Sequence, residues 1–222
     1  MFFLMARLLC IFGFSVIVGL QAQPTRSTYL PKHPFIHSEQ DTSAKSQIKP
    51  PLLVQNFSIV IDPGHGGHDI GTQSISKPRY QEKSLNLVTA KFMRDFLQQL
   101  GYQVLMTRED DKFVSLDKRA KIANDHKPVI FVSIHYNSAP SAEAEGIEVF
   151  FYQSKEDKER TIKSKRLAQV VLKNILVETK AKSRGVKHGN FLVIRETNMP
   201  AILVEGGFVT NEAEMQKLKD PI

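Results

Sequence analysis

The run Val129–Ile134 (VIFVSI) constrains the fold most, because five of its six residues are apolar. A strand with one face in solvent alternates apolar and polar residues, and this run leaves almost no polar face. Nearly continuous apolar strands are typical of parallel sheets that helices cover on both faces. The run therefore predicts a central strand of a layered α/β domain.

Further strands and helices alternate along the chain. Short apolar runs predict strands at Ser58–Ile61, Tyr102–Thr107, Ile147–Tyr152, Phe191–Ile194 and Ala201–Val204. Apolar residues at helical spacing predict helices over Glu82–Leu100, around Leu116–Ala123 and over Asp157–Glu178. This alternation predicts an α/β three-layer sandwich with a central, mostly parallel sheet flanked by helices.

The first 22 residues have the composition of a signal peptide. Arg7 is their only charged residue, and the apolar core Leu8–Leu20 is shorter than the ~20 residues of a membrane span. We expect cleavage near Ala22 and no stable membrane insertion afterwards; the alternative is an uncleaved N-terminal anchor. Cys10, the chain's single cysteine, would leave with this segment, which fits an oxidising compartment.

Residues 23–50 are predicted to be a flexible linker, since Pro, Ser, Thr and Lys are scattered there without an apolar period. His33 and His37 lie in it and are not expected to form a metal pair. The remaining residues, 51–222, form the predicted folded domain. The net charge of +7 suits either an anionic polymer or an ordinary solvated surface, and nothing beyond this charge favours nucleic acid as a partner.

Polar side chains follow three of the predicted strands directly. His65, His135 and Glu205 come at or just after strand ends, and Glu82 opens the first helix. In open α/β sheets such groups gather beyond the carboxyl ends of the strands. Two imidazoles and one carboxylate are a common ligand set for catalytic zinc, and a second carboxylate can transfer protons. Spacing alone leaves open that the histidines cap backbone groups and that the glutamates pair with lysines.

Five sequence blocks resemble the zinc-dependent N-acetylmuramoyl-L-alanine amidase family. They occur in the family's order and extend from residue 57 to about 220: IVIDPGHGGHDIGT (59–72), EKSLN (82–86), TR (107–108), SIHYNS (133–138) and PAILVEGGFVTN (200–211). The resemblance implies one zinc ion per chain, with His65, Glu82 and His135 as metal ligands and Glu205 as the catalytic residue. It also implies a six-stranded mixed sheet.

The activity implied by the resemblance is hydrolysis of the amide bond between N-acetylmuramic acid and L-alanine in peptidoglycan. A zinc peptidase acting within the stem peptides is the alternative, and a non-catalytic wall-binding module is disfavoured because all four site residues are present. We expect a monomer, exported to the periplasm or cell envelope. We expect no activator, because one helix and a short loop account for Gln153–Val186 and leave no room for an inserted helix that plugs the site.

Several neighbouring residues have predicted supporting roles. We expect the glycines around His65 (Gly64, Gly66 and Gly67) to let the backbone approach the metal ligands, and Gly206 and Gly207 to leave space for the peptide. Asp62 either orients His65 or is a loop-turn acid. The role of Asn137 is open, and His68 and His188 are expected at the surface.

Two features depart from the family's pattern. Tyr136 stands where a small residue is usual, so an aromatic ring could narrow the groove or stack on substrate. Asn211 and Glu214 form a capping-type helix start, after which the family's final helix is expected to be missing.

Overall fold

The computed structural model describes residues 57–219. The predicted signal peptide and linker, with Cys10, His33 and His37, lie outside the described residues. No helix within residues 57–219 has the length and apolarity needed to cross a membrane.

A six-stranded sheet forms the middle layer, and its order is β2-β1-β3-β6-β4-β5. The strands are β1 Ser58–Pro63, β2 Gln103–Met106, β3 Ile130–Asn137, β4 Ile147–Phe151, β5 Ser183–His188 and β6 Ala201–Phe208. All neighbours are parallel except β4 and β6, which are antiparallel. The predicted mostly parallel sheet is therefore confirmed.

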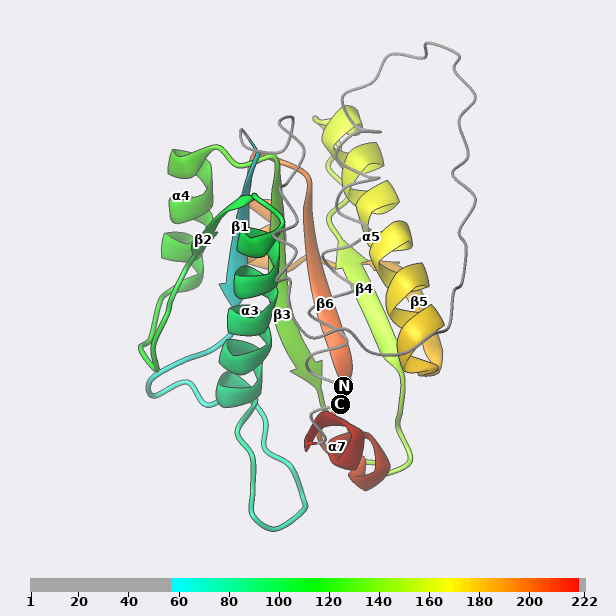
Figure 1. Cartoon of the computed structure of the whole chain (residues 1–222). Helices are drawn as coiled ribbons and strands as arrows, with labels where there is room; N and C mark the ends of the chain where they lie inside the picture. Colours follow the sequence, from blue (N-terminus) through cyan, green and yellow to red (C-terminus); the bar gives the residue numbers. More distant parts are fainter. Residues whose placement is uncertain (1–56, 220–222) are drawn as a thin grey trace, which may run out of the picture.

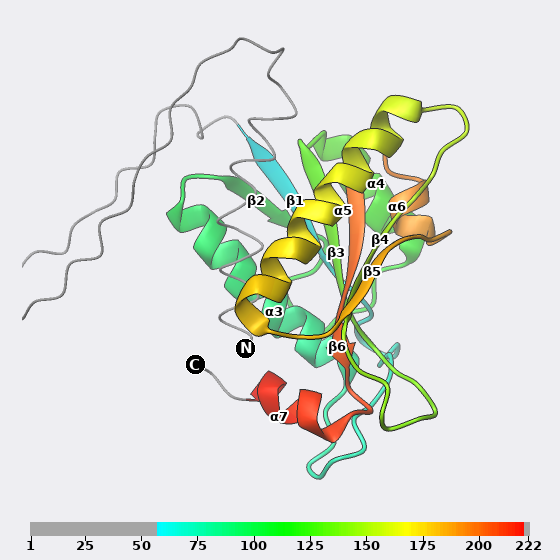
Figure 2. The same ribbon diagram turned by 90° about the vertical axis from the view of Figure 1, so that its right-hand side faces the viewer.

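Helices cover both faces of the sheet, as Figures 1 and 2 show. The helices are α3 Glu82–Gln99, α4 Leu116–His126, α5 Lys158–Thr179, α6 Leu192–Arg195 and α7 Glu212–Lys219. In Figure 2, α3 and α5 lie on one face and α4 and α6 on the other, whereas α7 lies at one end of the sheet. Asn211 begins α7 as predicted, since its side chain accepts a hydrogen bond from the Glu214 backbone N–H at 3.0 Å.

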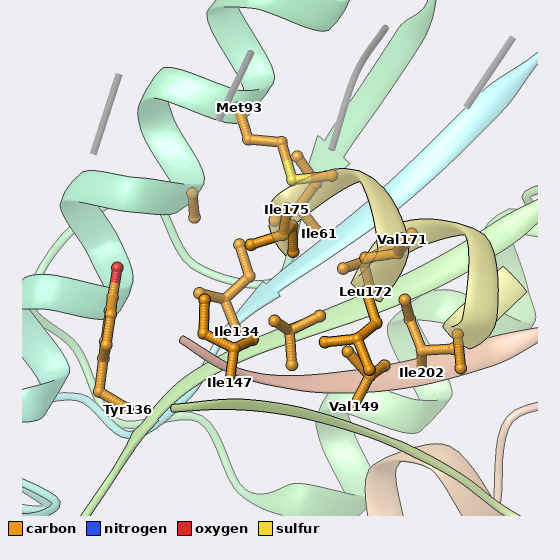
Figure 3. Close-up of a cluster of buried hydrophobic side chains, with 14 of the residues drawn as sticks. Ile61, Met93, Ile134, Tyr136, Ile147, Val149, Val171, Leu172, Ile175 and Ile202 are labelled. Carbon is orange, nitrogen blue, oxygen red and sulfur yellow. The ribbon is translucent and has the colours of Figure 1, made fainter. Parts of the chain in front are cut away.

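The core is split by the sheet into two parts. Alternate residues of β3 point to opposite faces, so that Ile134 belongs to the larger cluster under α3 and α5, whereas Phe131 belongs to the smaller one. Figure 3 shows Ile134 among side chains from other elements, including Met93 of α3 and Leu172 of α5. Burial on both faces explains why the sequence of β3 is almost entirely apolar.

One predicted strand is wrong. The segment Phe191–Ile194 forms most of the short helix α6, and the sixth strand is β5, which the apolar pattern missed. β5 lies at the edge of the sheet and has the sequence SRGVKH, of which four residues are exposed. Only strands with at least one buried face carry a strong apolar signal, so an exposed edge strand is difficult to predict.

The carboxyl ends of β1, β3 and β6 lie at the same edge of the sheet, because these strands are parallel neighbours. β4 runs the other way, so its amino end lies at that edge too. The connection 138–146 therefore passes from β3 to β4 across the end of β6. It is tied to the segment after β6, since Asn211 Nδ2 donates to the Ala142 carbonyl at 2.9 Å and Gly146 N–H donates to Glu214 Oε1 at 2.9 Å.

Candidate metal centre

His65, Glu82 and His135 converge at this edge of the sheet. Glu82 Oε1 lies 3.1 Å from His65 Nε2 and 3.0 Å from His135 Nδ1. One donor atom from each residue falls within 4.8 Å of the other two, and the imidazole rings lie edge to face with centroids 4.9 Å apart. The structure thus brings together the three residues that the resemblance implied as ligands.

The fold places each of these side chains by a different means. His65 follows β1 in the left-handed conformation, with φ 61°, and His135 lies near the end of β3. Glu82 is the first residue of α3, where the helix dipole favours a carboxylate. Its second oxygen accepts the Thr72 backbone N–H at 3.0 Å. These contacts fix Glu82 between the two imidazoles.

Two glycines provide the space for this cluster. A Cβ on Gly64 would lie 2.1 Å from His135 Cε1, and a Cβ on Gly71 would lie 2.5 Å from Glu82 Oε2. Gly64 therefore has the predicted role. Gly66 and Gly67 instead allow close approach to the backbone of Lys112 and Phe113. These two residues lie in the loop between β2 and α4 and are not candidate ligands.

Asp69 is the residue that orients His65. Its Oδ2 lies 2.9 Å from His65 Nδ1, which leaves Nε2 turned toward Glu82. A carboxylate on the far nitrogen of a ligating histidine fixes the tautomer and the ring orientation. The sequence had suggested Asp62 for this role. Asp69 lies four residues beyond His65 in a glycine-containing loop, where spacing gives no signal.

Asp62 belongs to a buried ion pair beneath the site. It is fully buried, and it accepts hydrogen bonds from Arg119 Nη1 at 2.8 Å, Thr107 Oγ1 at 2.6 Å and Ser133 Oγ at 2.8 Å. Burial alone would raise the pKa of Asp62, but Arg119 and the hydrogen bonds outweigh it and hold the pKa below its usual value. Asp62 is therefore neither a loop-turn acid nor a partner of His65.

Two buried arginines fix the loop after β1. Arg119 donates to the carbonyls of Pro63 and His65, both at 2.6 Å, and Arg108 donates to the carbonyl of Gly64 at 2.8 Å. Three consecutive carbonyls are thus held by rigid guanidinium groups. Sequence reasoning missed Arg119, although its position within the apolar stripe of α4 is a signal that a buried partner exists.

The electrostatics of the three-residue cluster suit a cation. Burial would raise the pKa of Glu82, but the two imidazoles outweigh it and hold that pKa well below its usual range. Burial would lower the pKa of His65, but Glu82 and Asp69 raise it to about 9. The cluster therefore favours positive charge at its centre. Two imidazoles and one carboxylate also match the usual donor set of catalytic zinc, so these residues fit such an ion.

Glu205 lies beside the cluster on β6, where it is the register partner of His135. Its Oε2 is buried and has no hydrogen-bond partner among the described residues. Burial is the main cause that raises the pKa of Glu205, and the neighbouring carboxylates of Glu82 and Glu148 add to it, so that the pKa is about 7. A carboxyl group with this pKa can take up and release a proton near neutral pH.

A cleft of about 340 Å³ opens over these four residues. Leu116, Phe191 and Leu192 form an apolar part of its wall, and Asn137 also lines it. Asn137 Nδ2 donates to Glu148 Oε1 at 2.7 Å, so this residue, whose role the sequence left open, joins β3 to β4 at the rim.

The other residues singled out in the sequence are not among the candidate ligands. Tyr136 lines the cleft, and its backbone N–H donates to Glu82 Oε1 at 3.2 Å. Its ring is buried in the core with the hydroxyl 2.7 Å from Thr89 Oγ1 on α3, so the ring is not free to stack on substrate (Figure 3). His68 packs against Phe113, and His188, on β5, accepts the Gln153 backbone N–H at 3.1 Å. Neither histidine belongs to the metal cluster.

The chain is similar to known proteins over most of its length. The family profile described as N-acetylmuramoyl-L-alanine amidase matches residues 59–222. A probable cell wall amidase LytH of Staphylococcus aureus is 35% identical over 187 residues, which are 84% of this chain and 59% of that protein. The LytH protein of Staphylococcus epidermidis is 35% identical over 165 residues, with 74% and 52% coverage. The chain thus spans little more than half the length of these curated relatives.

Solved structures are similar over most of the described fold. The N-acetylmuramoyl-L-alanine amidase from Clostridium difficile 630 is 42% identical with a TM-score of 0.69, and the match covers 75% of this chain and 87% of that one. The catalytic domain of CwlV, an amidase of Bacillus (Paenibacillus) polymyxa var. colistinus, is 39% identical with a TM-score of 0.67 and coverages of 74% and 87%.

Proposed function

Since the chain belongs to the N-acetylmuramoyl-L-alanine amidase family, we propose that it is a zinc-dependent hydrolase of the amide bond between N-acetylmuramic acid and L-alanine in peptidoglycan. The observation that carries the proposal is the meeting of His65, Glu82 and His135, with the buried carboxyl of Glu205 beside them. The three candidate ligands and Glu205, the proposed proton carrier, line one cleft.

The metal would be held by His65, Glu82 and His135. When bound, zinc supplies Lewis acidity, which polarises a substrate carbonyl and makes water more acidic. Asp69 holds the His65 ring with Nε2 toward Glu82, the orientation in which Nε2 would bind the metal. Arg108 and Arg119 keep the loop that carries His65 from shifting.

Glu205 is the proposed general base and acid. It accepts a proton from the attacking water as the new carbon–oxygen bond forms. It then gives a proton to the amide nitrogen as the carbon–nitrogen bond breaks, so that L-alanine leaves with a free amino group. A pKa of about 7 allows the same carboxyl group to perform both transfers near neutral pH.

The alternative is a zinc peptidase that cuts within the stem peptides, because the same ligands would serve any amide presented to them. We favour the amidase because relatives at 35% and 42% identity carry amidase names. We further propose that residues 1–22 direct export, so that the protein acts in the periplasm or cell envelope. There it would act as a monomer and without an activator, in cell-wall remodelling, cell separation or turnover.

Product analysis tests the proposed function. Purified peptidoglycan is digested with the zinc-loaded protein, and the released material is analysed by mass spectrometry. We expect intact stem peptides with N-terminal L-alanine, no release in the presence of a chelator, and recovery when zinc is added back. Fragments cut inside the stem would favour the peptidase, and digestion that survives full removal of metal would contradict the zinc dependence.

A further inference from the structure

A second buried carboxylate lies beside the site and is neither a candidate ligand nor the proposed proton carrier. Glu148 on β4 is the register partner of Glu205, and its side chain is only 6% exposed. It accepts hydrogen bonds from Asn137 on one side, and from Arg184 Nε, at 3.4 Å, and Lys187 Nζ on the other. A buried carboxylate is retained at low cost only where cations balance it, so these two basic residues are its charge partners.

Arg184 and Lys187 reach the same carboxylate because β5 contains a bulge. Residues three apart in a regular strand point to opposite faces of the sheet. Here Ile147 pairs with Ser183 and Glu148 pairs with Gly185, so Arg184 is an extra residue in the ladder, and Gly185 has φ 89°. A bulge re-aims a side chain in this way, often next to a functional site. Both cations therefore lie over Glu148.

The two cations still present charge to solvent. Their side chains are 35% and 42% exposed, whereas the carboxylate between them is almost completely covered. Glu148 neutralises one of the two positive charges, so one net positive charge remains at the surface. Among the described residues none accepts a hydrogen bond from Arg184 Nη2, and Lys187 Nζ has donors left beyond the one that Glu148 accepts.

This basic pair lies at a defined place relative to the reacting groups. The register runs from His135 to Glu205, then to Glu148, then to β5. Two strand spacings separate Glu205 from β5, which is about 10 Å. The scissile bond precedes the first residue of the stem peptide. In an extended peptide the second residue lies about 7 Å from that bond, and its carboxylate reaches a few ångströms further. The distance therefore suits the second residue of a stem peptide.

We propose that Arg184 and Lys187 form a carboxylate-binding subsite that recognises the acidic second residue of the stem peptide. The proposal rests on the proposed function, since it assumes that the scissile amide lies at the metal centre. The free carboxylate of the substrate would meet two preorganised cations, and charge-assisted hydrogen bonds to such cations are among the stronger polar contacts. Glu148 acts as a positioning residue that holds both cations on the β5 side of Glu205.

The test compares two synthetic muramoyl peptides that differ only at the second residue, which is D-glutamate in one and its neutral amide, D-isoglutamine, in the other. The variants are Arg184→Gln and Lys187→Gln, because glutamine can still donate to Glu148. Lys182→Gln is the matched control, since Lys182 precedes β5, is 65% exposed and pairs with Glu145 instead. Thermal unfolding of each variant shows whether the fold is retained.

We expect wild type to prefer the acidic substrate, and each subsite variant to lose about tenfold in kcat/KM on it, mainly through KM, with little change on the amide. Lys182→Gln should behave as wild type, and Lys187→Arg should keep most of the preference. Equal losses on both substrates, or a control as strongly affected as the subsite variants, would overturn the subsite.

Binding measured by calorimetry separates this proposal from the proposed function. The ligands are the peptides L-alanyl-D-glutamyl-lysine and its D-isoglutamine counterpart, titrated into zinc-loaded protein, so no turnover is needed. Wild type should bind the acidic peptide about tenfold more tightly, and the two Gln variants should lose that difference. Failure to cleave either muramoyl substrate would contradict the amidase activity alone, whereas equal binding of both peptides would refute the subsite alone.

Discussion

Replacement of Gly64 by alanine tests whether zinc binding depends on the position of the His135 ring. The added Cβ would lie 2.1 Å from Cε1 and 2.2 Å from Nε2 of that ring. Ordinary van der Waals contact begins at 3.4 Å, so the ring must retreat by about 1.3 Å. Metal–ligand distances tolerate only about 0.2 Å. The variant should therefore lose His135 as a ligand.

The expected loss of zinc affinity is at least about 100-fold, because removal of a mere supporting contact to a ligand already costs 10–100-fold. Zinc content after dialysis against a calibrated chelator gives the measurement. Gly64 does not have a positive φ, so alanine adds no backbone strain at this position and the fold should persist. Far-UV circular dichroism checks that the secondary structure is unchanged.

Gly185→Ala is the matched control, since its Cβ would meet nothing within 4 Å although φ is 89°. Strain there should lower the free energy of unfolding by about 1–2 kcal/mol and leave zinc affinity unchanged. The two variants thus separate a steric effect on the metal from a general loss of stability. A Gly64→Ala protein that binds zinc as tightly as wild type would refute the assignment of His135 as a ligand held against Gly64.

Three further changes address the proton carrier, the orienting carboxylate and the buried ion pair. Glu205→Gln should lower kcat by about 10²–10⁴-fold and retain zinc, and full activity in steady-state assays would remove Glu205 from the mechanism. Asp69→Asn should weaken zinc binding by about 10–100-fold in chelator competition, and unchanged affinity would show that His65 needs no orienting partner. Asp62→Asn should lower the free energy of unfolding in urea by about 3–5 kcal/mol, because it leaves Arg119 buried without its counter-ion. Because folding lowers the pKa of Asp62, this carboxylate stabilises the fold above about pH 4, and the stabilisation is lost as the pH falls below that value. The difference in the free energy of unfolding between wild type and Asp62→Asn should therefore shrink on acidification, and a constant difference would contradict this.

The sequence predicted the parts of the fold that are buried on both sides. β1, β3 and β6 are apolar because helices cover both their faces, and each ends in the polar residues that reach the cleft. Parallel neighbours end at one edge, so the convergence of His65, His135 and Glu205 followed from the order of elements. Glu82 joined them because α3 begins at the same edge.

The failures have physical reasons as well. β5 has no buried face to give an apolar period, and α6 has four residues, which is too short for a helical repeat. Asp69 rather than Asp62 contacts His65 because the loop turns back on itself at His65, which has a left-handed backbone conformation. The spacing of residues in the sequence does not predict such a turn. The sequence suggested that the ring of Tyr136 could narrow the groove or stack on substrate, because Tyr136 adjoins a candidate ligand. Alternation along β3 instead sends this ring to the face opposite that of His135.

The reversed direction of β4 also has a consequence for how the connection between β3 and β4 can vary among related chains. Because β3 and β4 are separated by β6, the segment 138–146 crosses the end of β6, where Asn211 and Glu214 hold it and its Ser138 lines the cleft. Lengthening or shortening a surface segment like this one leaves the packed interior untouched. The length of this segment is therefore free to change independently of the residues in the cleft.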